Sequence, residues 1–278
     1  MNNTRYKKLT LKGDDNMTIA TIIEYLDAEL HPEYQEDYDN AGFLLGDPRQ
    51  ECSGVLVAVD VTDAVIEEAQ ERGANLIVTH HPMIFGGVRN ITPDDATGRF
   101  IIKLIKNDMA VYAAHTNLDN LKNGVNGILA QVLGLTDCHI LRQMAGQPSS
   151  DVGAGMVGNL PYPMPTHAFL EQVKVCLGLP VLRVSDIATT SVSRVAVCGG
   201  AGSFLIGDAI SQQADIYLTG DMKYHDFQRA EGRITLADIG HFESEQFSKE
   251  LIYSIISKKF SNFACFISER GKSFVNYI

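Results

Sequence analysis

The feature that most constrains the fold is a series of short apolar runs with polar residues or glycine at their carboxyl ends. The runs are four to seven residues long, which suits β-strands better than buried helices. Segments with helical spacing lie between most of them. Strands alternating with helices of this length predict an α/β protein with mostly parallel sheets flanked by helices. The predicted strands are 54–60, 75–79, 109–114, 193–198, 215–219 and 233–238, and the predicted helices are 18–30, 62–72, 94–107, 166–178, 204–213 and 221–231.

The order of these elements repeats along the chain. GANLIVTHH (73–81) corresponds to QADIYLTGD (213–221), and AVYAAHTNLD (110–119) corresponds to TLADIGHFESE (235–245). We interpret the repeat as an internal duplication that gives two similar lobes, with two ordinary βαβ units as the alternative. The predicted organisation is a disordered N-terminal extension (1–16), a first α/β lobe (17–135), a bridging segment (136–190) and a second α/β lobe (191–278). Pairing of part of 136–190 with the sheet is the alternative for that segment.

The composition favours a cytoplasmic globular protein. None of the 278 residues belongs to an apolar stretch of the about 20 residues that a membrane helix needs. Residues 1–16 lack the apolar core of a signal peptide, and Met17 is an alternative start. A net charge of −11 without a basic run makes nucleic acid an unfavourable partner, because such binding depends on Lys and Arg. Five widely spaced cysteines, with no Cys-x-x-Cys pair, indicate reduced thiols rather than disulfides or a thiolate zinc site.

Imidazoles and carboxylates gather at the predicted strand ends. His80 and His81 follow one strand, and His115 follows another, with Asp119 four residues later. His241 and Glu245 repeat this spacing. Residues four apart share one helix face, and ligands of open α/β sheets collect beyond the carboxyl ends of the strands. We therefore predict one metal site between the two halves, with these ligands: His80, His81, Asp119, His241 and Glu245.

The residue types of the predicted ligands limit which metals the site could bind. Imidazole and carboxylate without thiolate suit Zn, Fe, Mn, Ni or Co. Five ligands exceed what one open site needs, whereas two divalent ions about 3.5–4 Å apart would use them all and would activate water. An ordinary helix cap beside a solvated acid is the alternative for His241 and Glu245. The remaining histidines without a matching acidic partner are expected to be packed or surface residues: His31, His139 and His167.

Three further features leave alternatives open. His115 is either a metal ligand or a residue that orients one. Asp221 and His225 also stand four apart. Asp221 either belongs with the residues that converge at the carboxyl ends of the predicted strands or simply caps the helix at 221–231. His225 would reach the site as an acid, a base or a substrate contact. The glycine-rich turn CGGAG (198–202) either cradles an anion with backbone N–H groups or is simply a tight strand-to-helix turn.

Six motifs occur together in this chain: YDNAGFLLGD (38–47, expected to be a loop), VTHHPMIF (78–85), AAHTNLDN (113–120), GGAGS (199–203), TGDMKYHD (219–226) and GHFESE (240–245). Together they resemble the GTP cyclohydrolase I type 2 homologue family, also called Nif-three-like, from about residue 18 to the C-terminus. The resemblance implies lobes related by pseudo-twofold symmetry, a dinuclear metal site with the same five ligands, and a toroidal homohexamer. Asp119 or Glu245 would bridge the ions, and Asn40, His115 and His225 match motif positions near the site.

Two functions follow as hypotheses. The first is a metal-dependent hydrolase, in which activated water attacks a nucleotide or another phosphate-containing small molecule and His115 or His225 moves the proton. The resemblance implies one such reaction, the hydrolytic opening of the GTP imidazole ring. The second is a non-enzymatic protein for metal binding, metal delivery or scaffolding, which a fully coordinated site without an open position would favour.

Overall fold

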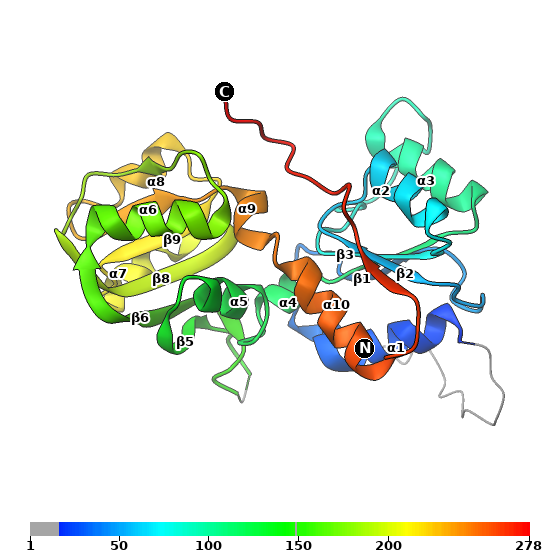
Figure 1. Ribbon diagram of the computed structural model, residues 1–278, viewed down its shortest axis with the longest axis horizontal. Coiled ribbons are helices and arrows are strands. Elements are labelled where there is room, and N and C mark those ends of the chain that lie inside the picture. Colours follow the sequence, from blue (N-terminus) through cyan, green and yellow to red (C-terminus); the bar gives the residue numbers. More distant parts are fainter. Residues whose placement is uncertain (1–16, 148) are drawn as a thin grey trace.

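The first lobe is built on a five-stranded sheet (Figure 1). The computed structural model describes residues 17–147 and 149–278, so the predicted extension at 1–16 lies outside the described residues. The strand order is β1-β4-β3-β2-β11, with β1 antiparallel to β4 and the other neighbours parallel. The strands are β1 (Gly42–Leu45), β2 (Val55–Ala58), β3 (Leu76–Thr79), β4 (Ala110–Ala113) and β11 (Cys265–Ile267).

Helices cover both faces of this sheet (Figure 1). Successive side chains of a strand point to opposite faces. Val55 and Val57 of β2 therefore pack with α1 and α10, whereas Leu56 and Ala58 pack with α2 and α3. Burial on both faces explains why these strands are unbroken apolar runs in the sequence. The helices are α1 (Ile19–Leu30), α2 (Asp63–Glu71), α3 (Ala96–Lys106) and α10 (Ser248–Lys259).

The second lobe is built on a six-stranded mixed sheet, in the order β5-β6-β8-β9-β10-β7. The central pairs β8–β9 and β9–β10 are parallel, whereas β5–β6, β6–β8 and β10–β7 are antiparallel. The prediction of mostly parallel sheets is therefore wrong for this lobe. The strands are β5 (Thr136–Gln143), β6 (Gly153–Pro165), β7 (Arg183–Val184), β8 (Ser191–Ala201), β9 (Ile216–Gly220) and β10 (Thr235–Asp238).

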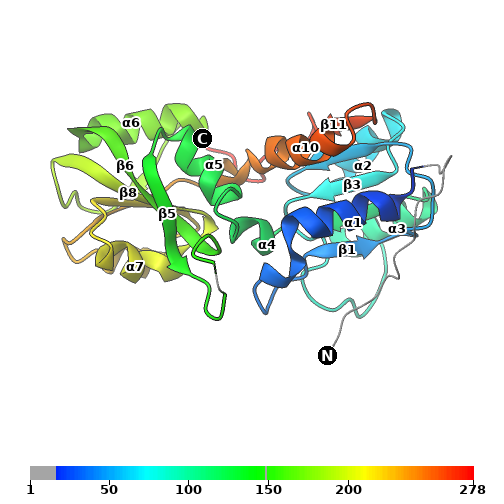
Figure 2. The same ribbon diagram turned by 90° about the horizontal axis from the view of Figure 1, so that it is seen from below.

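Helices also lie on opposite faces of the second sheet (Figure 2). On one face, residues of α5 and α6 pack against Val195 and Val197 of β8. On the other face, Ala196 of β8 packs with Ile206 and Ala209 of α7. The helices and turns of this lobe are α5 (Val125–Val132), α6 (Thr166–Leu177), α7 (Ile206–Ser211), α8 (Tyr224–Gln228) and the short 3-10 turn η2 (Ser203–Leu205).

The chain passes between the lobes twice (Figure 1). It enters the second lobe between α4 (Thr116–Asp119) and α5, and it returns between α9 (His241–Glu245) and α10. Because β11 then pairs with β2, the C-terminal segment completes the first sheet and not the second. Both crossings bring their polar residues to the junction of the lobes.

Three sequence-based assignments differ from this arrangement. The range 136–190, predicted to bridge the lobes, contains β5, β6, α6 and β7 of the second lobe. The range 191–278, predicted as one lobe, contributes α10 and β11 to the first. The expected loop at 38–47 contains β1 and follows the 3-10 turn η1 (Pro32–Tyr34). Several of these strands pair with strands far away in the chain, β1 with β4, β7 with β10 and β11 with β2, so that local residue patterns do not reveal the pairing.

Two expectations from composition can be compared with the described residues. Among them, no helix combines the length and apolar character that crossing a membrane requires. All five cysteines lie in the described part of the chain and are free thiols.

Candidate metal centre

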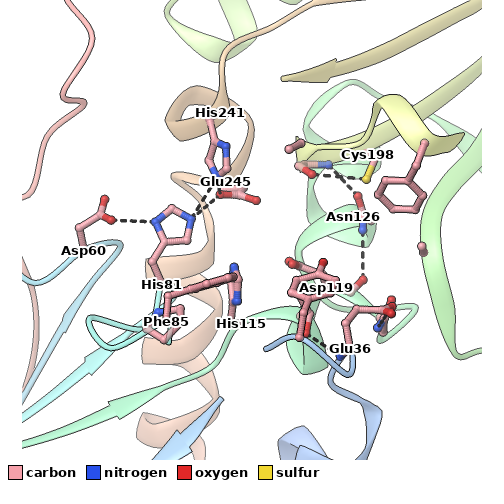
Figure 3. A pocket seen from close by; sticks show the side chains of 18 residues that line it. Glu36, Asp60, His81, Phe85, His115, Asp119, Asn126, Cys198, His241 and Glu245 are labelled. Atoms are coloured by element: carbon pink, nitrogen blue, oxygen red, sulfur yellow. Dashed lines mark hydrogen bonds and ion pairs between the residues drawn. The ribbon is translucent and has the colours of Figure 1, made fainter. Parts of the chain in front are cut away.

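The predicted ligands lie where the two lobes face each other. His80 and His81 follow directly after β3, and Asp119 ends the short helix α4 after β4. His241 and Glu245 lie on α9, which follows β10 of the other sheet. Figure 3 shows the labelled side chains pointing into one cavity. We refer to the five predicted ligands together as the histidine–carboxylate cluster: His80, His81, Asp119, His241 and Glu245.

Glu245 is the centre of this cluster. One carboxylate oxygen, Oε2, lies 2.8 Å from Nε2 of His81 and 3.1 Å from Nε2 of His241. The other oxygen, Oε1, lies 3.6 Å from Nε2 of His80. The Nε2 atoms of His81 and His241 are 3.3 Å apart. The ligand atoms of His80, His81 and Glu245 all lie within 4.8 Å of one another, so this group could hold a metal ion.

Two buried atoms of the cluster have no hydrogen-bond partner among the described residues: Nε2 of His80 and Oδ1 of Asp119. They lie 3.5 Å apart. Nδ1 of His80 donates to the carbonyl oxygen of Ala114 at 2.8 Å, which leaves the lone pair on Nε2. Buried polar atoms are almost always satisfied in native proteins, and unsatisfied ones call for an explanation such as an ion. A cation between the two atoms would satisfy both.

A carboxylate orients each of three further histidines at the cavity: His81, His115 and His241. Nδ1 of His81 lies 2.8 Å from Asp60, and Nδ1 of His241 lies 2.7 Å from Asp221. Nδ1 of His115 lies 2.7 Å from Asp39. Hydrogen bonds of this kind fix the ring and the tautomer of metal-binding histidines, with Nε2 left for the ion. Three carboxylates are thus part of the site: Asp39, Asp60 and Asp221.

The pKa values reflect the crowding of charge. Burial alone would lower the pKa of His81, but its hydrogen bonds to Asp60 and Glu245 raise that pKa to about 10. The pKa of His241 likewise rises to about 9, since contact with Glu245 outweighs burial. Burial raises the pKa of Asp119 to about 6, with the nearby imidazoles opposing the rise. Burial would also raise the pKa of Glu245, yet the surrounding histidines hold it well below its usual range.

The glycine-rich turn at the end of β8 lies beside Glu245 of the cluster. The amide of Gly199 donates to Asn126 at 2.9 Å, and the amide of Gly200 donates to Ser244 at 3.0 Å. The amide of Gly202 donates to Thr219 at 2.8 Å. These N–H groups are therefore already used within the protein. The structure favours the tight-turn interpretation over the anion cradle.

Gly200 has a second constraint, because its φ is +59° and a Cβ there would collide with Oε1 of Glu245. We expect Gly200→Ala to lower the free energy of unfolding by about 2 kcal/mol, through left-handed strain and overpacking. Metal content should fall as Glu245 is displaced. Gly207→Ala in α7 is the matched control, since no atom lies within 4 Å of the added carbon. Urea unfolding and metal analysis of both variants would check this, and equal behaviour would contradict it.

The other predicted residues divide into two groups. His115 borders the cavity, with its ring centroid 5.4 Å from that of His80 and 5.5 Å from that of His81. His225 is exposed on α8, contacts Tyr224, and is not among the residues that line this cavity. Asn40 is not among those lining residues either, and its side chain donates to the carbonyl oxygen of Ile84 at 2.7 Å.

Sequence reasoning missed several residues of the site. For Asp221 the capping alternative is wrong, since Asp221 contacts His241 and Lys223 takes the N-cap position of α8. Asp60 lies at the carboxyl end of an apolar run, as His80 does, so the strand-end rule could have found it. Asn126 donates to the carbonyl oxygen of Asp119 at 3.0 Å and so ties α5 to the cluster. No local pattern marks Asn126 in the sequence.

The fold and the cluster together define a class: a two-lobed α/β protein whose histidines and carboxylates meet at the lobe junction and could hold a metal ion. The chain belongs to the Duf34/NIF3 (NGG1p interacting factor 3) family, whose model matches residues 17–272. This confirms the resemblance seen in the motifs.

Individual relatives agree with this assignment. A Clostridium perfringens protein named GTP cyclohydrolase 1 type 2 homolog is 37% identical over 232 residues, covering 82% of this chain and 87% of that protein. The structure of the Staphylococcus aureus hypothetical protein SA1388 is similar with a TM-score of 0.87 at 31% identity, covering 95% of this chain and 100% of that one. A Bacillus cereus protein related to NIF3 gives a TM-score of 0.85 at 26% identity, with coverage of 95% and 100%. The two structures support the mixed α/β fold.

Proposed function

We propose that this protein is a metal-dependent hydrolase with two divalent ions held by the histidine–carboxylate cluster. The observation that carries the proposal is the pair of buried, unpartnered atoms on His80 and Asp119 that face Glu245. The donor set suits Zn, Fe, Mn, Ni or Co.

The two oxygens of Glu245 divide the cluster into two sets of donors. His80 and Asp119 lie on the side of Oε1, whereas His81 and His241 lie on the side of Oε2. Each set holds three donor atoms when Glu245 is shared, which is the number typical of catalytic sites that keep an open position. Glu245 would therefore contribute one oxygen to each set. Bound ions would supply Lewis-acid chemistry that makes water nucleophilic near neutral pH.

The chain's own residues orient the reaction. Asp39 accepts a hydrogen bond from Nδ1–H of His115, so that Nε2 of His115 is the atom that can take up or release a proton at the cavity. Hydrogen bonds from His115 and Thr116 overcome burial and hold the pKa of Asp39 at about 2, so it remains an anion. Because His225 lies away from the cavity, proton transfer in this proposal depends on His115 alone.

The cavity favours catalysis over metal storage. It has a volume of about 450 Å³, and His81, His241 and Glu245 are among the residues that line it. A storage site has no need of such a cavity. The name of the Clostridium perfringens relative makes nucleotides the first substrates to test.

Metal removal provides the direct test. Protein purified without chelator should carry about two ions per chain, the number that five such ligands suit. Chelation should abolish turnover of a panel of nucleotides and phosphoesters, and adding back a divalent ion should restore it. Elemental analysis and a turnover assay on the same samples would measure both. Turnover that survives complete metal removal would contradict the hydrolase proposal.

Several wider features remain proposals from the family resemblance and the residue patterns: the internal duplication with its pseudo-twofold symmetry, the cytoplasmic location and the toroidal homohexamer. An assembly would cover the large apolar side chains that the second lobe leaves exposed. Tyr162, Val175 and Tyr224 are each exposed by more than 80%. Exposed apolar groups of this kind are typical of contact surfaces.

A further inference from the structure

The cavity over the histidine–carboxylate cluster continues into a second one. The second cavity has a volume of about 620 Å³ and leads to Arg142 on β5. Both cavities are bordered by Glu36, Tyr38 and Phe204, among other shared residues. The site is therefore a cleft with the metal ligands at one end. A substrate that reaches the ligands also touches the walls of this cleft.

Aromatic side chains form much of these walls. Tyr38, Phe85 and Phe204 are 61%, 53% and 49% exposed. The rings of Tyr38 and Phe85 are 6.2 Å apart and inclined by only 34°. Phe85 also contacts His115, which places an aromatic surface beside the cluster (Figure 3). Large aromatic side chains left open to solvent in a cavity are typical of sites that bind flat apolar rings.

The charges of the cleft disfavour a polyphosphate at its far end. Glu33, Glu36 and Asp37 contribute carboxylates there. Among the described residues that line the two cavities, Arg142 is the only lysine or arginine. Its guanidinium is already paired with Asp208, through Nε at 3.1 Å, and lies over the ring of Phe204.

The neighbouring glycine turn does not compensate for this shortage of positive charge. The amides of Gly199, Gly200 and Gly202 are occupied by side chains of the protein. A carboxylate such as Glu36 is an acceptor for N–H groups and repels phosphate.

We propose that this cleft selects a flat aromatic heterocycle with N–H donors, a free base or nucleoside of the guanine type, over the corresponding nucleoside triphosphate. The ring lies against Phe204 and the pair formed by Tyr38 and Phe85, and its N–H groups donate to Oε2 of Glu36, because Oε1 already accepts from Asn120 at 3.1 Å. The inference rests on the proposed function, because it names the substrate class of the same site.

Equilibrium binding to the metal-loaded protein tests the inference without requiring turnover. Guanosine should bind at least as tightly as GTP, and tighter than inosine, which lacks the exocyclic amino donor. Phe204→Ala should weaken guanosine binding by about tenfold, as loss of stacking on a base does. Glu36→Gln should reduce the preference for guanosine over inosine. Tyr253→Ala is the control, because Tyr253 is an exposed aromatic residue of α10 that lines neither cavity.

The outcomes separate this inference from the hydrolase proposal. GTP binding more than tenfold tighter than guanosine binding would overturn the inference. It would also be overturned if Phe204→Ala and Glu36→Gln both unfold thermally like wild type and both keep the wild-type affinity for guanosine. Guanosine binding that responds to these variants supports the inference even if no hydrolysis is found. If the protein hydrolyses a substrate in a metal-dependent way but neither variant changes guanosine binding, the hydrolase proposal stands and the present inference is wrong.

Discussion

Replacing Glu245 by alanine is expected to cause the largest loss of metal binding of any single substitution in this chain. Glu245 is 3% exposed, and its two oxygens contact His80 on one side and His81 and His241 on the other. Losing a residue that only orients a ligand typically costs about 10–100-fold in metal affinity. A shared ligand should cost more, so we expect a decrease of at least about 100-fold.

Competition with a chelating dye, followed by elemental analysis after dialysis, would measure this decrease. Glu250→Ala is the matched control, since Glu250 is an exposed acid on the following helix α10. Glu245→Gln keeps the size of the side chain but removes its charge, so its affinity should lie between those of wild type and Glu245→Ala. Wild-type affinity in Glu245→Ala would show that the cluster is not the metal centre.

The sequence predicts that the site residues meet in one place, because the ends of the strands can be located from the local residue pattern. In the first lobe, both faces of β2, β3 and β4 are buried, so these strands appear as apolar runs whose last residues can be located within a position or two. Parallel neighbours place those ends at one edge of the sheet. His80, His81 and His241 followed from this reasoning. The meeting of Glu245 with the paired histidines follows from how the two lobes pack.

The architecture around the site was less predictable, because it depends on pairings across long distances in the chain. β6 contains glycines and prolines, and its register with β8 shifts between Asn159 and Met164, so it lacks a regular alternation. β11 has only three residues, all partly exposed, yet it completes the sheet of the other lobe beside β2. The partner of His115 is Asp39, 76 residues earlier. Only the packed fold identifies such partners.

Replacing Glu68 should destabilise the first lobe, because Glu68 holds the C-terminal segment that returns to this lobe. This is the second of the two largest effects that we expect. Glu68 of α2 is 3% exposed. It accepts hydrogen bonds from the Ser268 hydroxyl at 2.6 Å and from the amides of Glu269 and Arg270 at 3.1 and 3.2 Å. One buried carboxylate thus holds the turn that follows β11. Glu68→Ala leaves these donors without their acceptor, and we expect a loss of about 3 kcal/mol in the free energy of unfolding.

Glu71→Ala provides the control on the same helix. Glu71 pairs with Arg270, but the two side chains are 61% and 41% exposed. A surface ion pair of this kind contributes less than about 1 kcal/mol. Urea unfolding of both variants at neutral pH would measure the difference. Equal losses would show that the buried carboxylate has no special role in holding the C-terminal segment.

Acid should remove the advantage of wild type over Glu68→Ala. Burial alone would raise the pKa of Glu68, but hydrogen bonds from Ser268 and the two amides outweigh burial and lower it. A folded-state pKa below the unfolded value, about 4.3 for a glutamate, stabilises the fold at higher pH, and this stabilisation is lost as the pH falls through the folded pKa. The difference in unfolding free energy should therefore be constant from neutral pH to about pH 5 and shrink below about pH 4. A difference that stays constant into the acid range would mean that Glu68 contributes through packing and not through its charge.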